Sequence, residues 1–162
     1  MKPQHVLIVS DTHSKDIVYY QVVKKEAPLT MVVHAGDAEG QDDRLAAICR
    51  VPFYCVRGNN DFFSDLPSDL EFYIGDVKTF LTHGHHYYCS FTEADMIDEA
   101  RRRSCKILIY GHTHRPTAHF TDGILVLNPG SLTYPRQYDH RPSYILLDID
   151  EHGTPSAEIR YV

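Results

Sequence analysis

The octapeptide YGHTHRPT, Tyr110 to Thr117, begins with the last residue of the apolar run KILIY at 106–110. That run has the length and the aliphatic residues of a buried strand, and it ends at a glycine. His112 and His114 come just after the glycine and stand one residue apart. Alternate residues of an extended segment point to the same side, so the spacing places both imidazoles on one side of the chain at a strand end.

Similar short runs of β-branched and aliphatic residues occur upstream of this segment, and polar-apolar segments of helical character separate several of them. Since strand, helix and strand in succession favour parallel pairing, we expect parallel strands in the first half of the chain. The expected strands are 5–10, 30–35, 53–57, 71–74 and 77–82, and the expected helices are 14–26, 42–49 and 91–104.

The helix expected over 91–104 has several signals in its own sequence. Thr92 is a candidate N-cap, acidic residues come early and basic residues come late. Met96, Ile97 and Ala100 fall along one face, which predicts the side that is buried. The basic run RRR at 101–103 closes this helix, where cations favour the negative helix end, so a phosphate-binding patch is the weaker interpretation.

The second half of the chain has a different pattern, in which strand-like runs follow one another without helical segments between them. Strand-like runs at 117–128, 143–150 and 156–162 are joined or interrupted by Asp122-Gly123 and Glu151-His152-Gly153, which are tight-turn signals. We therefore expect antiparallel strands there. A layered α/β sandwich of two sheets with helices outside accommodates this order of elements. With no internal repeat, low-complexity segment or linker, residues 1–162 are expected to form a single domain.

A polar group follows the end of each of five expected strands. In open α/β sheets, ligands bind beyond the carboxyl ends of the strands, so these groups should meet at one rim. Each motif alone has a plainer interpretation, such as a helix N-cap, a turn or exposed histidines. Their joint occurrence favours a metal site. The motifs are Asp11-Thr12-His13, Gly36-Asp37, Gly58-Asn59-Asn60-Asp61, His83-Gly84-His85 and Gly111-His112-Thr113-His114.

The residue types in these motifs indicate the kind of metal. Asp, His and Asn without Cys suit Mn, Fe, Co, Ni or Zn better than a structural thiolate zinc site. A carboxylate can bridge two cations, and two ions about 3.5–4 Å apart form a clamp for the attacking and leaving oxygens of a phosphoryl group. The adjacent glycines permit sharp turns and a close approach of the backbone.

Composition excludes several classes of function. The formal net charge of −6 and the pI of about 6.0 argue against broad binding to nucleic acid or to anionic membranes. The N-terminal apolar run is only five residues long, too short for a signal sequence or a membrane span, so we expect a cytoplasmic protein. The four scattered cysteines, with no C-x-x-C pair, predict reduced buried thiols.

The ordered set D-x-H, G-D, G-N-x-D, H-G-H and G-H-x-H across 11–114, with LNPGS at 127–131, resembles the calcineurin-like metallophosphoesterases. It is most similar to their small bacterial and archaeal phosphodiesterases, the group related to the retromer subunit with a phosphoesterase fold. The resemblance implies a four-layer αββα sandwich, with two mixed β-sheets flanked by helices. It also implies a dinuclear metal site.

Carried over position by position, the resemblance assigns ligands to two divalent ions per chain. Mn²⁺ is the first expectation, with Ni²⁺, Co²⁺, Fe²⁺ and Zn²⁺ as alternatives. A water or hydroxide between the ions would attack phosphorus, so no protein nucleophile is needed. Asp11, His13 and His114 would hold one ion, Asn59, His83 and His112 the other, and Asp37 would bridge them.

One position departs from many family members, which have a histidine where this chain has Asn60. An amide donates a hydrogen bond but cannot act as a general acid, which predicts slow turnover and substrates with good leaving groups. Small members of the family commonly share this departure. We expect Asn59 and Asn60 to take part in catalysis, and His85 to replace the missing acid if it faces the site. A position of His85 at the surface is an equal alternative.

The expected function is hydrolysis of small organic phosphodiesters. The alternatives are a phosphomonoesterase on the same site, a weakly catalytic interaction scaffold and a single-metal structural site; a homo-oligomer is compatible with each. Some residues have weaker roles: bracing by Asp61, loop shaping by Asn128, Gly130 and Ser131, phosphate contact by Arg136, and pocket walls or core packing by Phe62-Phe63 and Tyr87-Tyr88. No role is assigned to His5, His34, His119, His140 and His152.

Overall fold

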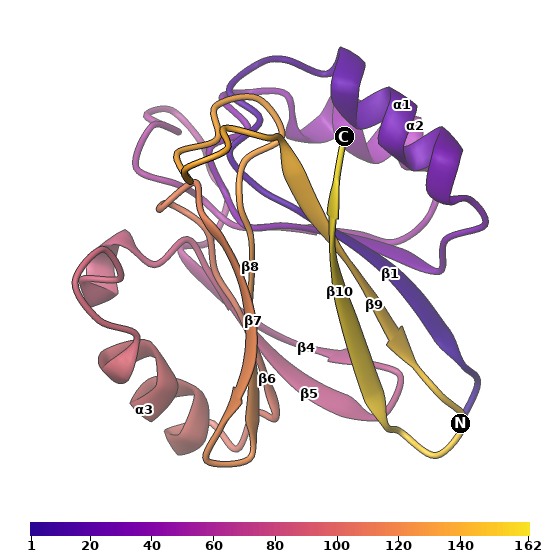
Figure 1. The fold of residues 1–162 in the computed structure, drawn as a ribbon, viewed down its shortest axis with the longest axis vertical. Coiled ribbons are helices and arrows are strands. Elements are labelled where there is room, and N and C mark those ends of the chain that lie inside the picture. The colour runs from indigo at the N-terminus through magenta and orange to yellow at the C-terminus, as the bar shows by residue number, and fades with distance from the viewer.

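Two five-stranded sheets pack face to face in the computed structural model, which describes residues 1–162 (Figure 1). Helices α1 and α2 cover the outer face of one sheet, and α3 covers the outer face of the other. The four-layer αββα arrangement implied by the sequence is therefore confirmed. The structure contains no helix that is long and apolar enough to cross a bilayer.

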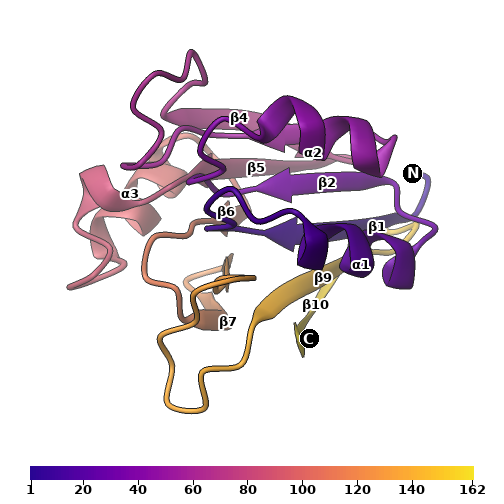
Figure 2. The same ribbon diagram turned by 90° about the horizontal axis from the view of Figure 1, so that it is seen from above.

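The first sheet has the order β10-β9-β1-β2-β3. β1 pairs in parallel with β2, and β2 with β3, as expected for strands joined by helices. β9 is antiparallel to both β1 and β10, so the sheet is mixed. Figure 2 shows β1 and β2 running in the same direction. The strands are β1 (Gln4–Val9), β2 (Met31–His34), β3 (Phe53–Cys55), β9 (Ser143–Ile149) and β10 (Pro155–Tyr161).

The second sheet has the order β4-β5-β6-β8-β7 and corrects one expectation. β4 and β5 lie in the first half of the chain but pair antiparallel, because only Gly75 and Asp76 connect them and so short a link permits only a hairpin. β6 pairs in parallel with β5 and with β8. The strands are β4 (Asp69–Ile74), β5 (Val77–Thr82), β6 (Ile107–Ile109), β7 (Pro116–Thr121) and β8 (Ile124–Pro129).

The helices are α1 (Ile17–Glu26), α2 (Asp42–Cys49) and α3 (Ala94–Arg102), and a short 3-10 turn spans His85–Tyr87. Thr92 is not the N-cap of α3, because the helix begins later than its sequence signals indicate and Glu93 occupies that position. The Thr92 hydroxyl still accepts a hydrogen bond from the Ala94 N–H at 3.1 Å. Met96, Ile97 and Ala100 are buried, as their common face predicted.

Apolar side chains fill three spaces between the layers. The largest cluster lies between the two sheets and includes Ile8, Val33, Leu81 and Ile109. These residues sit near the carboxyl ends of β1, β2, β5 and β6, so the core fixes the ends from which the polar loops begin. All four cysteines are free and buried, as predicted.

Candidate metal centre

The loops that follow β1, β2, β3, β5 and β6 meet at one end of the two sheets and bring the seven predicted ligands together. Asp11, Asp37, His83 and His114 are buried, whereas Asn59 is exposed at the mouth of the site. Residues that are distant in sequence thus converge because parallel strands place their carboxyl ends at the same edge.

One group of ligand atoms comes from the ends of β1 and β6. Asp11 Oδ1 lies 3.2 Å from His114 Nε2 and 3.8 Å from His13 Nε2. The two Nε2 atoms of His13 and His114 lie 3.3 Å apart. Three atoms that can each donate an electron pair therefore surround one point.

A second group surrounds His83, whose Nε2 lies 3.0 Å from Asn59 Oδ1 and 3.5 Å from Asp37 Oδ2. His112 Nδ1 lies 3.1 Å from the same Asn59 oxygen. Asp37 Oδ2 is also 4.0 Å from His13 Nε2 in the first group. Asp11 Oδ1 is 3.8 Å from His83 Nε2. Both carboxylates therefore lie between the two groups.

Neighbouring acceptors fix which nitrogen of each imidazole faces the site. His13 Nδ1 bonds to the Glu39 carboxylate at 2.9 Å. His83 Nδ1 bonds to the Ala35 carbonyl and His114 Nδ1 to the Tyr134 carbonyl, each at 2.6 Å. Because a carbonyl and a carboxylate only accept, each Nδ1 carries a proton and each Nε2 faces the site.

The centre has the properties expected of a cation site. Lone pairs of His13 and His114 that face each other at 3.3 Å repel unless a proton or a metal ion lies between them. Asp11 Oδ1 is buried and has no hydrogen-bond partner. Buried carboxylate oxygens are ordinarily paired, so this oxygen is explained by a bound cation. The residues present therefore fit divalent metal ions, with oxygen and nitrogen ligands only.

The backbone at the centre is strained. Five of the seven predicted ligands have φ between 46° and 69°, the left-handed region that side chains with a Cβ rarely adopt. Such strain concentrates at functional sites, where the surrounding structure enforces it. The five residues are Asp11, His13, Asp37, His112 and His114.

Two glycines allow the loops to approach closely, as the sequence predicted. A Cβ at Gly58 would lie 2.1 Å from Asp37 Oδ1, and a Cβ at Gly111 would lie 2.2 Å from Ser10 Oγ. Both distances are well below van der Waals contact, so any larger residue would displace the ligand loops.

Charges in the site favour ionised carboxylates. Burial raises the pKa of Asp37, but the hydrogen bond and charge of His83, together with bonds from Asn60, outweigh it and the pKa is lowered. Burial also raises the pKa of Asp11, but the hydrogen bond of His114 and the charges of His83 and His114 outweigh burial, and the pKa is lowered. The pKa of His83 is raised despite burial, because Asp37 and Asp11 lie beside it. A metal ion at His83 therefore competes with a proton.

Several residues brace the ligand loops. The Asp61 carboxylate accepts hydrogen bonds from the Gly58, Asp37 and Glu39 N–H groups at 2.8, 2.9 and 2.6 Å, consistent with the bracing role expected of it. The Ser131 hydroxyl donates to the Asp11 carbonyl at 2.7 Å. Asn128 Nδ2 donates to the Gly111 carbonyl at 3.1 Å, so the segment LNPGS holds the first and last ligand loops.

His34 was assigned no role from the sequence, yet its buried ring forms hydrogen bonds to two of the ligand loops. Its Nδ1 accepts a hydrogen bond from the Gly36 N–H at 3.1 Å, so Nε2 carries the proton and donates to Thr12 Oγ1 at 3.0 Å. Burial lowers the pKa of His34 to about 4. The signal in the sequence was its position inside a fully buried strand, where a polar side chain needs partners.

The catalytic candidates occupy distinct positions. Asn60 donates through Nδ2 and its backbone N–H to the two oxygens of Asp37, at 2.9 and 2.8 Å, so it orients that carboxylate. His85 is half-buried, with its ring centroid 6.0 Å from that of His112 and its Nδ1 unpaired. Burial and the charge of His83 lower the pKa of His85 to about 4, which keeps the ring neutral.

The remaining candidates lie around the rim or away from it. Arg136 is exposed, and its backbone N–H donates to the His114 carbonyl at 3.0 Å. Phe62 and Phe63 are exposed beside the Asn59 loop. Tyr87 donates to the Asp69 carboxylate at 2.6 Å, which gives it a structural role, whereas Tyr88 is exposed.

Comparison with known proteins agrees with this geometry. A sequence profile of the calcineurin-like phosphoesterase superfamily domain matches residues 5–152. The probable metallophosphoesterase YsnB of Bacillus subtilis is 31% identical over 158 residues, which cover 97% of this chain and 89% of that protein. The phosphodiesterase MJ0936 of Methanocaldococcus jannaschii is 38% identical over 119 residues, 73% of this chain and 64% of that protein.

The fold is shared with solved structures as well. A crystal structure of a conserved protein from Streptococcus pneumoniae, described as a predicted phosphoesterase, superimposes with a TM-score of 0.83. The two sequences are 28% identical, and the match covers 99% of each chain. The similarity therefore extends over all four layers.

Proposed function

The chain belongs to the calcineurin-like phosphoesterase superfamily and is a metal-dependent phosphoesterase, and from this premise we propose that it hydrolyses small organic phosphodiesters at a dinuclear divalent-metal centre. The observation that carries the proposal is the pair of adjoining ligand groups, Asp11 with His13 and His114 and Asp11 with Asp37 and His83, in which the buried Asp11 Oδ1 has no hydrogen-bond partner. A closed structural site usually needs four ligands, and seven converge here.

We assign Asp11, His13 and His114 to one ion, Asn59, His83 and His112 to the other, and Asp37 to both. We expect Mn²⁺ first, with Ni²⁺, Co²⁺, Fe²⁺ and Zn²⁺ as alternatives, because oxygen and nitrogen donors suit each of these ions. Two bound divalent ions would supply Lewis acidity, both to activate water and to neutralise the charge that builds on the phosphoryl oxygens.

The protein's own groups orient this chemistry. Glu39, Ala35 and Tyr134 hold three imidazoles in the tautomer that directs Nε2 inward. Asn60 is a positioning residue, since its backbone N–H and its Nδ2 each donate a hydrogen bond to Asp37. His85 is the nearest candidate for contact with the leaving group, and as a neutral ring it can offer a hydrogen bond but little acid catalysis. Slow turnover of diesters with poor leaving groups follows.

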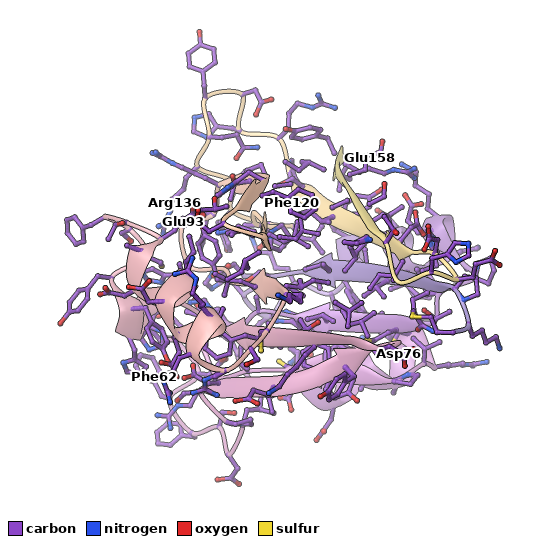
Figure 3. The ribbon with its side chains drawn as sticks, turned by 90° about the horizontal axis from the view of Figure 1, so that it is seen from below. Phe62, Asp76, Glu93, Phe120, Arg136 and Glu158 are labelled. Atoms are coloured by element: carbon purple, nitrogen blue, oxygen red, sulfur yellow. The ribbon has the colours of Figure 1, made fainter.

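The test is hydrolysis of bis-p-nitrophenyl phosphate and of p-nitrophenyl phosphate by chelator-stripped protein titrated with Mn²⁺, Ni²⁺, Co²⁺, Zn²⁺ and Mg²⁺. We expect metal-dependent turnover that favours the diester and that Asp37→Ala removes. Asp76→Ala is the matched control, because Asp76 is exposed at the opposite end of the molecule from Arg136 and the rim (Figure 3).

Metal content should be measured on the same samples by mass spectrometry. Two ions per chain in the unchanged protein and fewer in Asp37→Ala would agree with the assignment. Two ions per chain without turnover of either ester would refute the catalytic proposal and favour an interaction scaffold. Faster turnover of the monoester would replace the diester assignment by a phosphomonoesterase.

A further inference from the structure

A cavity of about 750 Å³ opens beside the metal centre. The cavity and the metal centre share a wall, because Asn60 lines the cavity while its backbone N–H and its Nδ2 donate to Asp37. Glu39 also lines it while its carboxylate holds His13. A diester bound at the centre could therefore reach into this cavity with one of its two arms. The lining consists of Glu39, Gly40, Asp42, Asp43, Asn60, Asp61, Phe62, Phe63, Ser64, Asp65 and Leu66.

The lining contains five carboxylates and no Lys, Arg or His. Asp61 is occupied by three backbone N–H groups, and Glu39 by His13. Asp42 and Asp43 lie in the first turn of α2, which favours negative charge but adds no counter-ion. Asp43 and Asp65 are exposed and form no ion pair within the chain. The cavity is therefore strongly electronegative.

Two aromatic rings, Phe62 and Phe63, also line the cavity, and neither packs into the core. Phe62 is 71% exposed and Phe63 is fully exposed, and neither belongs to a hydrophobic cluster of the core. Figure 3 shows Phe62 at the same end of the molecule as Arg136 and the rim. Exposed rings beside carboxylates offer both cation–π and Coulomb attraction to one kind of group, an organic cation.

We propose that this cavity is a subsite for one arm of the diester and that it selects an arm carrying an ammonium group. The inference rests on the proposed diesterase function and adds the class of substrate. The negative wall repels arms that carry a second phosphate or a carboxylate, and the rings favour an alkylated ammonium over a sugar. Asp43, Asp65 and Phe62 are the residues that determine this specificity.

The test compares two diesters that differ only in the charge of one arm. These are p-nitrophenyl phosphorylcholine and its uncharged isostere, p-nitrophenyl 3,3-dimethylbutyl phosphate, assayed with Mn²⁺-loaded protein. We expect kcat/KM for the choline ester to exceed that of the isostere by about tenfold, which corresponds to about 1.4 kcal/mol. Raising the salt concentration should reduce the ratio, because the carboxylates are exposed.

Variants test whether the cavity causes this ratio. Asp43→Asn combined with Asp65→Asn should bring the ratio close to one, and Phe62→Leu should lower it while keeping the apolar bulk. Asp76→Asn combined with Glu158→Gln changes the net charge by the same amount at residues outside the lining, and should leave the ratio unchanged. A ratio near one in the unchanged protein, or an equal loss in both double variants, would overturn the proposal.

Failure of the subsite is distinguishable from failure of the diesterase proposal. If neither diester is hydrolysed, the catalytic proposal fails, and calorimetric binding of choline against 3,3-dimethylbutanol then tests the cavity directly. Preferential binding of choline that the Asp43 and Asp65 substitutions weaken would support the subsite. Equal or undetectable binding of the two alcohols would overturn it.

Discussion

Lowering the pH from 7 towards 4 should destabilise this protein through His34, even when metal ions are absent. The ring is completely buried beneath the ligand loops and is neutral, because Nδ1 accepts from the Gly36 N–H and Nε2 donates to Thr12. Protonation would place a second N–H where Gly36 already donates, and would charge a ring that has no water around it.

The direction in which acid changes the free energy of unfolding follows from the pKa of His34 in the folded and in the unfolded chain. Burial lowers the pKa of His34 from 6.5 to about 4, while the unfolded chain keeps the ordinary value. Between these values the unfolded state binds a proton that the folded state does not, so the free energy of unfolding falls as the pH falls. Each pKa unit corresponds to about 1.4 kcal/mol, which gives a loss of about 2 kcal/mol at pH 5 and about 3 kcal/mol at pH 4.

The assay is urea unfolding of chelated protein from pH 7.5 to 4, for the unchanged chain and for His34→Gln. Glutamine keeps a donor for Thr12 and cannot titrate, so the variant should be less stable at pH 7.5 and should lose less stability on acidification. His152→Gln removes an exposed histidine and serves as the control. The pKa of His85 is also lowered to about 4 and affects both curves equally, so the difference between the two curves isolates His34.

Parallel loss of stability in the unchanged protein and in His34→Gln would refute this reasoning, because it would mean that His34 does not resist protonation. The ring can also be observed directly by NMR. Its carbon-bound proton should titrate near pH 4, far below the ordinary histidine value of 6.5. Titration of His34 near 6.5 in the folded protein would contradict the burial and tautomer assigned to it.

Two further predictions concern the loops around the metal centre. Glu39→Ala should weaken metal binding about 10- to 100-fold, because His13 loses the acceptor that fixes its tautomer, whereas Glu39→Gln keeps an acceptor and should lose less; calorimetric titration with Mn²⁺ measures both. Gly58→Ala should lower the free energy of unfolding by roughly 1–3 kcal/mol and reduce bound metal, because the new Cβ would meet Asp37 Oδ1 at 2.1 Å; unchanged urea stability would contradict it.

Much of the fold could be predicted because its elements have local signals. The helix at 42–49 and the strand at 77–82 were predicted with the observed ends, and the buried face of α3 follows from its spacing. The antiparallel pairing of β4 with β5 was missed, because the prediction took the strand and helix order of the first fifty residues as general. Strand order depends on contacts between distant segments, which a single sequence does not record.

The candidate site, like the fold, could be predicted from the sequence only in part. Its seven predicted ligands carry a signature in their residue types and positions, and the structure brings them together. The carbonyls of Ala35 and Tyr134 orient two of the imidazoles, yet any residue can supply a carbonyl, so no side-chain pattern reveals them. His34 was overlooked because its partners, Gly36 and Thr12, lie on two different loops.

The strain of the ligand loops links metal binding to folding. The chain holds five ligand residues in the left-handed region and directs two imidazole lone pairs at each other, each an unfavourable arrangement when considered alone. The arrangement persists because the core between the sheets fixes the strand ends and because Asp61, Ser131 and His34 tie the loops together. A cation converts the facing lone pairs from repulsion into coordination. The free energy of binding therefore adds to that of folding, by about 4 kcal/mol at a thousand times the dissociation constant.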